Sequence, residues 1–166
     1  MTDTKQSLLS FPDPVNEVAA RLVATGVVVL ATTIVVFDLP WLTLLLAYGF
    51  VARVLTGPKL SPLGLFVTRV LVPRLPFAER PVPGPPKRFA QGVGVVFSVT
   101  AAVLALGFDE VGAASVVLGL LIAAASLEAF VGLCLGCQAF RLLMLMGVIP
   151  ESVCERCAPA STMMRA

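Results

Sequence analysis

The sequence predicts an all-α protein, a four-helix transmembrane bundle with an interfacial amphipathic helix between its second and third helices. Of the 166 residues, 58% are hydrophobic and 13% are charged, about half the charged fraction of an average soluble domain. The mean hydropathy is +0.96. A chain of this length cannot bury so much apolar surface in a core of its own, so we expect part of that surface to face lipid.

Four apolar segments give the predicted helices, and they cover residues 18–37, 39–55, 89–108 and 111–131. A helix of about 20 residues crosses the roughly 30 Å of hydrocarbon in a bilayer, so the first, third and fourth segments are long enough. The second is of marginal length and can cross where the bilayer is thinned. Because no alternation with a period of two is present, a membrane β-barrel is excluded. Short turns at 38–40 and 109–110 pair the segments into two hairpins.

The segment between the two hairpins, residues 57–88, holds half of the chain's basic residues: Lys59, Arg69, Arg74, Arg80, Lys87 and Arg88. The hairpin turns hold none, so the positive-inside rule places this segment and both termini in the cytoplasm. We therefore expect a multi-pass protein of the bacterial inner membrane. Within the segment, residues 60–75 mix apolar residues with arginine and predict a short helix at the membrane surface.

The predicted domain organisation follows from this topology. Residues 1–14 form a cytoplasmic N-terminal segment, residues 15–149 form the four-helix membrane domain, and residues 150–166 form a cytoplasmic tail that contains cysteine.

The charge and the amino-acid composition exclude several function classes. A net charge of +2 gives no strong attraction to nucleic acid, so we expect no nucleic-acid partner. Histidine is absent, which excludes Ser-His-Asp and Cys-His catalysis, His-ligated haem and Cys₂His₂ zinc sites.

Three ionisable residues inside the apolar segments predict a polar pocket near the cytoplasmic edge of the membrane: Arg21, Arg53 and Glu128. Ionisable groups at this depth are costly and usually face a partner or a wet cavity. We expect Arg53 and Glu128 to form an ion pair. Such a pair either fixes helix packing or takes part in handling a ligand or a proton.

All four cysteines lie near the C-terminus, as Cys134-Leu-Gly-Cys137 and Cys154-Glu-Arg-Cys157. Cys134 and Cys137 are the predicted catalytic thiols, and Cys154 and Cys157 are a possible resolving pair. Gly132 and Gly136 permit a helix break before or within the first motif. If residues 138–148 restart as a helix, Cys137 lies at its N-terminus, and we expect it to be the more acidic thiol.

Three interpretations of the cysteines remain open. The favoured one is a pair of redox-active or sulfur-carrying dithiols, which requires no metal or other cofactor. In the second, the four thiolates of Cys134, Cys137, Cys154 and Cys157 bind one Zn²⁺, since C-x₂-C-x₁₆-C-x₂-C falls within the zinc-ribbon range. In the third, the cysteines are small apolar residues without chemistry.

Six short stretches also resemble a bacterial family of four-helix integral membrane proteins that is described only as a domain of unknown function. They are Val15-Asn16-Glu17 with Ala20-Arg21-Leu22, Tyr48-Gly49-Phe50 before Arg53, Gly57-Pro58-Lys59-Leu60-Ser61-Pro62-Leu63, Pro86-Lys87-Arg88-Phe89-Ala90, Leu127-Glu128-Ala129, and Cys134-Leu-Gly-Cys137. The resemblance covers about residues 14–140, and its most specific element is the C-terminal Cys-x-Gly-Cys. It implies a membrane location and a thioredoxin-like or sulfurtransferase partner.

The sequence thus leads to one expected function and one alternative. The expected function is thiol–disulfide exchange or reduced-sulfur handling by cytoplasmic CxxC thiols, together with a soluble partner. The alternative is a zinc-stabilised, non-catalytic membrane scaffold or transporter accessory.

Overall fold

The computed structural model describes residues 11–75, 80–154 and 157, so most of the predicted N-terminal segment and the end of the predicted tail lie outside it. The fold is all-α apart from one two-stranded ribbon, in which β1 (Val15–Asn16) pairs antiparallel with β2 (Pro81–Val82). Four long helices form the body of the molecule: α1 (Glu17–Phe37), α2 (Leu42–Thr56), α4 (Gly84–Ala102) and α5 (Val111–Ser126). Two shorter helices flank them: α3 (Pro62–Phe66) and α6 (Leu135–Leu145).

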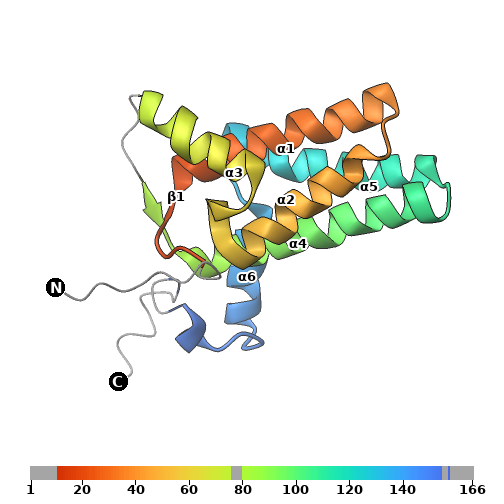
Figure 1. The fold of residues 1–166 in the computed structure, drawn as a ribbon. Helices are drawn as coiled ribbons and strands as arrows, with labels where there is room; N and C mark the ends of the chain where they lie inside the picture. Colours follow the sequence, from red (N-terminus) through yellow and green to blue (C-terminus); the bar gives the residue numbers. More distant parts are fainter. Residues whose placement is uncertain (1–10, 76–79, 155–156, 158–166) are drawn as a thin grey trace, which may run out of the picture.

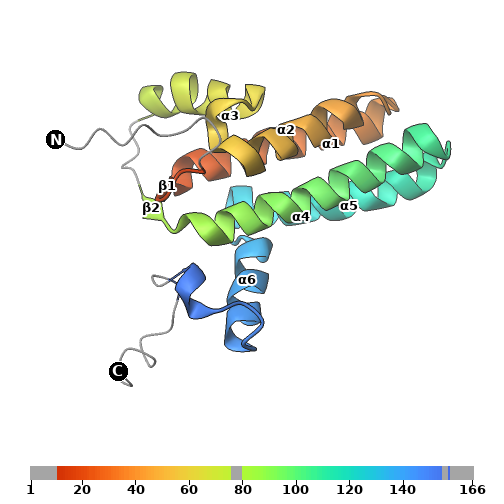
Figure 2. The ribbon, with the colours of Figure 1, turned by 60° about the horizontal axis from the view of Figure 1, so that its bottom comes forward.

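The four long helices lie side by side as two hairpins, α1–α2 and α4–α5 (Figure 1). Both hairpin turns lie at one end of the bundle, whereas α3, the β-ribbon and α6 lie at the other end (Figure 1). Helix α2 packs on α4, and α1 packs on α5. Helix α6 packs on α4 but runs away from the bundle at a steep angle (Figure 2). One end of the bundle therefore consists of the two hairpin turns, whereas the other end carries the additional helices and the ribbon.

Three helical segments of the described chain are long and apolar enough to cross a membrane. They are Glu17–Phe37, Gly84–Gly107 and Val111–Val131, with mean hydropathies of 2.1, 2.0 and 2.1. The last two each extend an α-helix by one wider, π-helical turn, Val103–Gly107 after α4 and Leu127–Val131 after α5. The predicted all-α membrane protein is confirmed in these terms.

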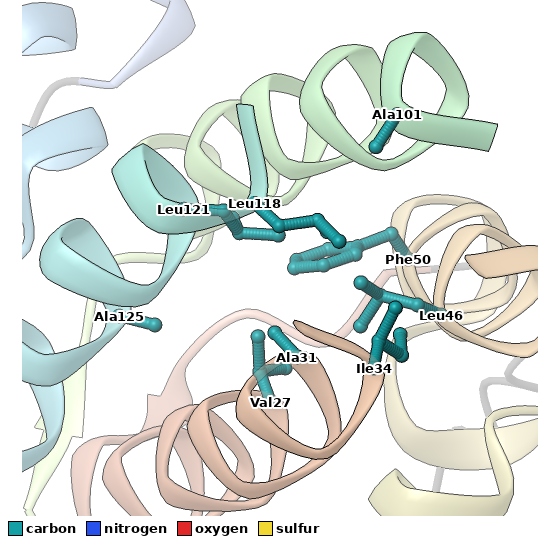
Figure 3. Packing of buried hydrophobic residues seen from close by; sticks show 9 residues of the cluster. All are labelled: Val27, Ala31, Ile34, Leu46, Phe50, Ala101, Leu118, Leu121 and Ala125. Atoms are coloured by element: carbon teal, nitrogen blue, oxygen red, sulfur yellow. The ribbon is translucent and has the colours of Figure 1, made fainter. Parts of the chain in front are cut away.

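An apolar core joins all four long helices (Figure 3). Its buried members are Val27, Ala31, Ile34, Leu46, Phe50, Ala101, Leu118, Leu121 and Ala125. Phe50 of α2 packs closely on α4, since a Cβ at Gly94 would clash with the Phe50 ring. Outside the core, large apolar side chains such as Val29, Val96 and Val116 are exposed, as expected of helices that face lipid.

One helix boundary in the hairpins needs correction. We expected the third helix to start at residue 89, but α4 begins at Gly84 because Pro85 and Pro86 fit the first turn of a helix. In the first hairpin, Asp38 ends α1 in the left-handed conformation with φ of 50°. The turn between α1 and α2 carries Trp41, which is 60% exposed.

A helical segment occupies the position of the predicted interfacial helix. Helix α3 continues through a π-helical turn, Val67–Leu71, into a 3₁₀ turn, Val72–Arg74. Val67 is buried against Ala19 and Val23 of α1. Phe66 is exposed.

Candidate functional site

The first CxxC motif lies at a sharp break between α5 and α6. The break falls at Gly132, whose φ of +79° is readily adopted only by glycine. Cys134 is the N-cap of α6, which begins at Leu135. The prediction that a helix restarts near residue 138 with Cys137 at its N-terminus is therefore wrong, because the chain needs only one of the two available glycines to turn.

Gly136 has a different role from the predicted helix break. It lies within α6, and a Cβ added there would come within 2.5 Å of the Cβ and 2.6 Å of the Cα of Ala90. The absence of a side chain thus lets the first turn of α6 pack directly against α4. This contact fixes the position of the cysteine motif relative to the bundle.

The two thiols of the motif contact each other at the start of α6. The backbone N–H of Cys137 donates to Cys134 Sγ over 3.4 Å. The Cys137 thiol also donates a hydrogen bond to the Cys134 thiolate, which lowers the pKa of Cys134. The same bond and burial raise the pKa of Cys137. The order of acidity is therefore the reverse of the predicted one.

The N-cap position adds to this difference between the thiols. The unpaired N–H groups and the dipole of a helix favour negative charge at its N-terminus. The positive charge of Lys87 acts on Cys134 in the same direction, whereas Glu128 opposes it. Cys134 is buried and Cys137 is half-buried. The negative charge is thus favoured at Cys134 rather than at Cys137.

An open cavity of about 380 Å³ adjoins the motif. Its lining includes both thiols, the charged side chains Glu17, Lys87 and Arg141, and Cys157 of the second CxxC pair. The cavity therefore brings sulfur atoms of both pairs to one space.

The second pair is closed as a disulfide between Cys154 and Cys157, whose Cα atoms are 5.3 Å apart. Cys154 is buried against Phe140 and Met144 of α6, and Phe89 of α4 packs on the same cluster. The ring centroids of Phe89 and Phe140 are 5.7 Å apart. Apolar packing thus holds the disulfide beside α6, the helix that Cys134 caps.

The sulfurs of the second pair are not available as metal ligands in the oxidised state that the structure shows. Cys154 and Cys157 are bonded to each other, whereas a four-thiolate zinc site needs all four sulfurs free. In the part of the chain that the structure describes, no three Cys, Asp or Glu side chains form a group that could hold a metal ion.

Arg21 of α1 contacts the π-helical turn, Leu127–Val131, that follows α5. Its Nε donates to the carbonyl of Ala129 over 3.2 Å, and its Nη2 donates to that of Phe130 over 3.0 Å. These carbonyls belong to the last turn before Gly132, where a helix leaves acceptors unpaired. Arg21 therefore stabilises the chain break that precedes the first CxxC motif.

The predicted partner of Glu128 was Arg53, but the structure pairs Glu128 with Lys87. Lys87 Nζ lies 2.6 Å from Glu128 Oε1, and both side chains are largely buried. Arg53 instead donates from Nε to Gln91 Oε1 over 2.9 Å. Lys87 and Gln91 are one helical turn apart on α4, so this one helix contacts two of the three predicted pocket residues, Glu128 and Arg53.

Lys87 and Gln91 were not among the predicted site residues. Lys87 was counted with the basic loop because the third helix was expected to begin after it. The signal that identifies it is the spacing Lys87-x₃-Gln91, which places two polar groups on one face of α4 once the helix is extended back to Gly84.

The comparison with protein families gives one match, over residues 15–145, to the family described as Domain of unknown function (DUF4395). No curated protein matches the chain, and no solved structure matches it. The match includes the four long helices and the first CxxC motif, but not the second. The chain therefore belongs to this family.

Proposed function

We propose that the protein is a multi-pass membrane protein that carries out thiol–disulfide exchange through Cys134 and Cys137. The observation that carries this proposal is the position of Cys134 at the N-cap of α6, where the N–H of Cys137 donates to its sulfur. A thiolate that is stabilised at a helix N-terminus, with a second thiol one turn away, is suited to attack a disulfide and then to be released.

The proposed reaction transfers two electrons to a protein disulfide of a soluble partner. The Cys134 thiolate attacks one sulfur of that disulfide, a mixed disulfide forms, and the partner's other sulfur leaves as a thiolate. Cys137 then loses its proton and attacks Cys134 Sγ, which releases the partner's second thiolate. The Cys134–Cys137 disulfide is the oxidised product, and the partner is the reduced product.

As an alternative acceptor to the partner's disulfide, the Cys154–Cys157 disulfide is proposed to take the two electrons of the first pair. Cys157 lines the same cavity as both thiols. In this step the Cys134 thiolate attacks Cys157 Sγ and breaks the Cys154–Cys157 bond. Cys137 then attacks Cys134 Sγ, so the first pair is oxidised and the second is reduced. A reversible disulfide of this kind suits the reducing cytoplasm, where permanent disulfides are rare.

The proposed topology has four spans, with α2 as the fourth, and with both termini and the segment around α3 in the cytoplasm of a bacterial inner membrane. Helix α2 has 15 residues but packs along α4 over the apolar core. The hairpin turns lack basic residues, whereas the segment before α4 is rich in them. Helix α3 and its extension lie at the basic end, which fits an interfacial helix with Phe66 toward lipid.

The partner is proposed to be a soluble thioredoxin-like or sulfurtransferase protein. Its point of access is the open cavity beside α6, outside the apolar surface of the four long helices. Transfer of a sulfane sulfur is the related alternative, since the same thiolate would accept it.

Alkylation of variants in which one cysteine is replaced tests the thiol chemistry. In the Cys137→Ser variant, which keeps a donor beside Cys134, alkylation of Cys134 by iodoacetamide should remain fast below the pH at which a free cysteine reacts. A Cys134 that titrates like a free thiol would contradict the proposal. Metal analysis of the purified protein supplies the second arm, because stoichiometric zinc that is lost on mutating either pair would establish the zinc-stabilised scaffold instead.

The internal transfer has its own test. The double variant Cys137→Ser, Cys154→Ser leaves Cys134 and Cys157 as the only thiols, and mild oxidation should join them. The matched variant Cys134→Ser, Cys154→Ser should give less of the corresponding Cys137–Cys157 bond. Peptide mass spectrometry reads out both bonds, and absence of the Cys134–Cys157 bond would refute the transfer.

A further inference from the structure

Arg53 is a buried cation whose hydrogen-bonding capacity is only partly used. It is 5% exposed. Its Nε donates to Gln91, its Nη1 donates to Ser61 Oγ over 3.5 Å, and its guanidinium lies 4.5 Å from the centroid of the Phe50 ring. Nη2 is buried without any partner, and among the described residues no other buried side-chain nitrogen or oxygen lacks one. An orphaned donor on a buried charge is costly, so a bound group is expected there.

The charge balance around Arg53 points to an anion. Lys87 engages the carboxylate of Glu128 at 2.6 Å. No ion pair joins Arg53 to a carboxylate in the described ranges of the chain. Two cations and one carboxylate leave one positive charge without a counter-charge in a site that is shielded from water.

A cavity of about 200 Å³ lies next to this charge. Arg53, Lys87 and Gln91 line it on the side of the bundle, and Asn16 and Thr68 line it from β1 and the α3 segment. The remaining lining is mostly apolar. The volume is several times the roughly 30 Å³ that one water molecule occupies in the liquid.

We infer that this cavity binds an oxyanion, with Arg53 as its main ligand. A guanidinium offers paired N–H donors that match the oxygens of sulfate, phosphate or a carboxylate. Arg53 lines the cavity and holds an unpaired Nη2 donor, and Lys87, which also lines it, adds a second positive charge. Because the site lies at the end of the bundle that carries α3 and α6, the oxyanion is either a free solute or the phosphate of a lipid headgroup. The inference is independent of the thiol chemistry.

Gly49 provides a way to close the site without removing Arg53. A Cβ at Gly49 would lie 3.7 Å from Arg53 Nη1 and 4.0 Å from Ser61 Oγ, which are ordinary contacts. The Gly49→Asp variant therefore places a carboxylate beside the guanidinium and supplies the missing counter-charge. Gly49→Ala adds the same Cβ without charge and serves as its matched control.

The test is a sulfate titration of the full-length protein in nanodiscs of phosphatidylcholine, read by calorimetry against sodium chloride of equal ionic strength. We expect sulfate binding that Arg53→Gln and Gly49→Asp weaken by about tenfold or more, as the loss of charge-assisted hydrogen bonds requires. Gly49→Ala and Arg69→Gln, which removes an exposed cation, should bind like the wild type. If Arg53→Gln does not fold, Gly49→Asp still decides the outcome.

A second arm distinguishes the two sources of the oxyanion. The wild type and Gly49→Asp are each placed in nanodiscs of phosphatidylglycerol without sulfate. Native mass spectrometry then shows whether lipid stays bound to the wild type but not to Gly49→Asp. Retained lipid identifies the ligand as a headgroup, and sulfate binding in phosphatidylcholine identifies a free solute. Binding in neither arm, or binding that Gly49→Asp leaves unchanged, would overturn the inference.

Discussion

The two ends of the helix bundle are built from different interactions. Toward the hairpin turns, the interior is apolar, and Ile34, Leu46 and Leu118 are each no more than 4% exposed. Toward α6, the interior holds Arg53 and Lys87 at 5% and 8% exposure, together with Glu128 and Cys134. The stability of an apolar core depends on how well side chains fill its volume. The stability of a buried polar cluster depends on the presence of every hydrogen-bonding or charged partner. We therefore expect the hairpin end to respond to changes of side-chain volume and the α6 end to respond to the loss of any one polar partner.

The largest expected effect comes from breaking the Lys87–Glu128 pair. Glu128→Ala leaves a buried ammonium without its partner, and loss of one member of a buried pair costs about 3–5 kcal/mol. Lys87→Ala should be similarly harmful, while the double variant should lose less than the sum. Unfolding in a denaturing detergent measures the cycle. The control is Glu110→Ala at the exposed hairpin turn, with an expected change within about 0.5 kcal/mol. Additive losses would show that the ion pair is not coupled.

A smaller effect is expected from overpacking the apolar end. Gly94→Ala would push a methyl group into the ring of Phe50, and such overpacking costs about 1–3 kcal/mol. Gly92→Ala, two residues away on α4, meets no atom within 4 Å and should be neutral or slightly stabilising. The same detergent unfolding compares the two. Equal stability of both variants would show that α2 and α4 are not packed as closely as described.

Gly136→Ala separates the position of the cysteine motif from the stability of the bundle. The added methyl group must displace α6 from Ala90, so we expect the Cys134 alkylation rate to change by several-fold, with a stability loss of about 1 kcal/mol. Gly119→Ala on α5, which meets no atom within 4 Å, should change neither. Unchanged alkylation of Gly136→Ala would mean that the contact with α4 does not position Cys134.

The last expected effect concerns a single hydrogen bond and leaves the packing of the helices unchanged. Cys137→Ala removes the donor that lowers the pKa of Cys134, so the pKa rises and the thiolate fraction at pH 7 falls. Alkylation at pH 7 should slow by roughly tenfold relative to Cys137→Ser, which keeps a hydroxyl donor. Rates of both variants should converge at high pH, where Cys134 is fully ionised. Equal rates at pH 7 would contradict the role of Cys137 as donor.

The sequence predicted the apolar end better than the polar end. Helix boundaries at the hairpin turns agree within a few residues because segments of about 20 apolar residues are set by the thickness of a bilayer. The start of α4 was misplaced because its prolines resembled a linker, although proline is tolerated in a first helical turn. That one error hid Lys87 and led to the incorrect pairing of Arg53 with Glu128.

The cysteine site illustrates the second limit of prediction from the sequence. Two glycines, Gly132 and Gly136, each allowed a break, and local propensity does not distinguish them. Packing does, since the α4 backbone at Ala90 requires the missing side chain of Gly136 within the helix. The order of acidity of Cys134 and Cys137 follows from this choice. Tertiary contacts therefore decided which thiol is the N-cap.

The exposed Trp41 at the hairpin turn makes the protein its own optical probe. It is the chain's single tryptophan, so all indole fluorescence originates at the end of the molecule opposite to the cysteines. Its emission reports the polarity around that turn without interference from events at α6. In sealed vesicles, a water-soluble quencher added outside would reach this indole only when the turn faces outward, which gives the orientation of each inserted molecule from a native residue.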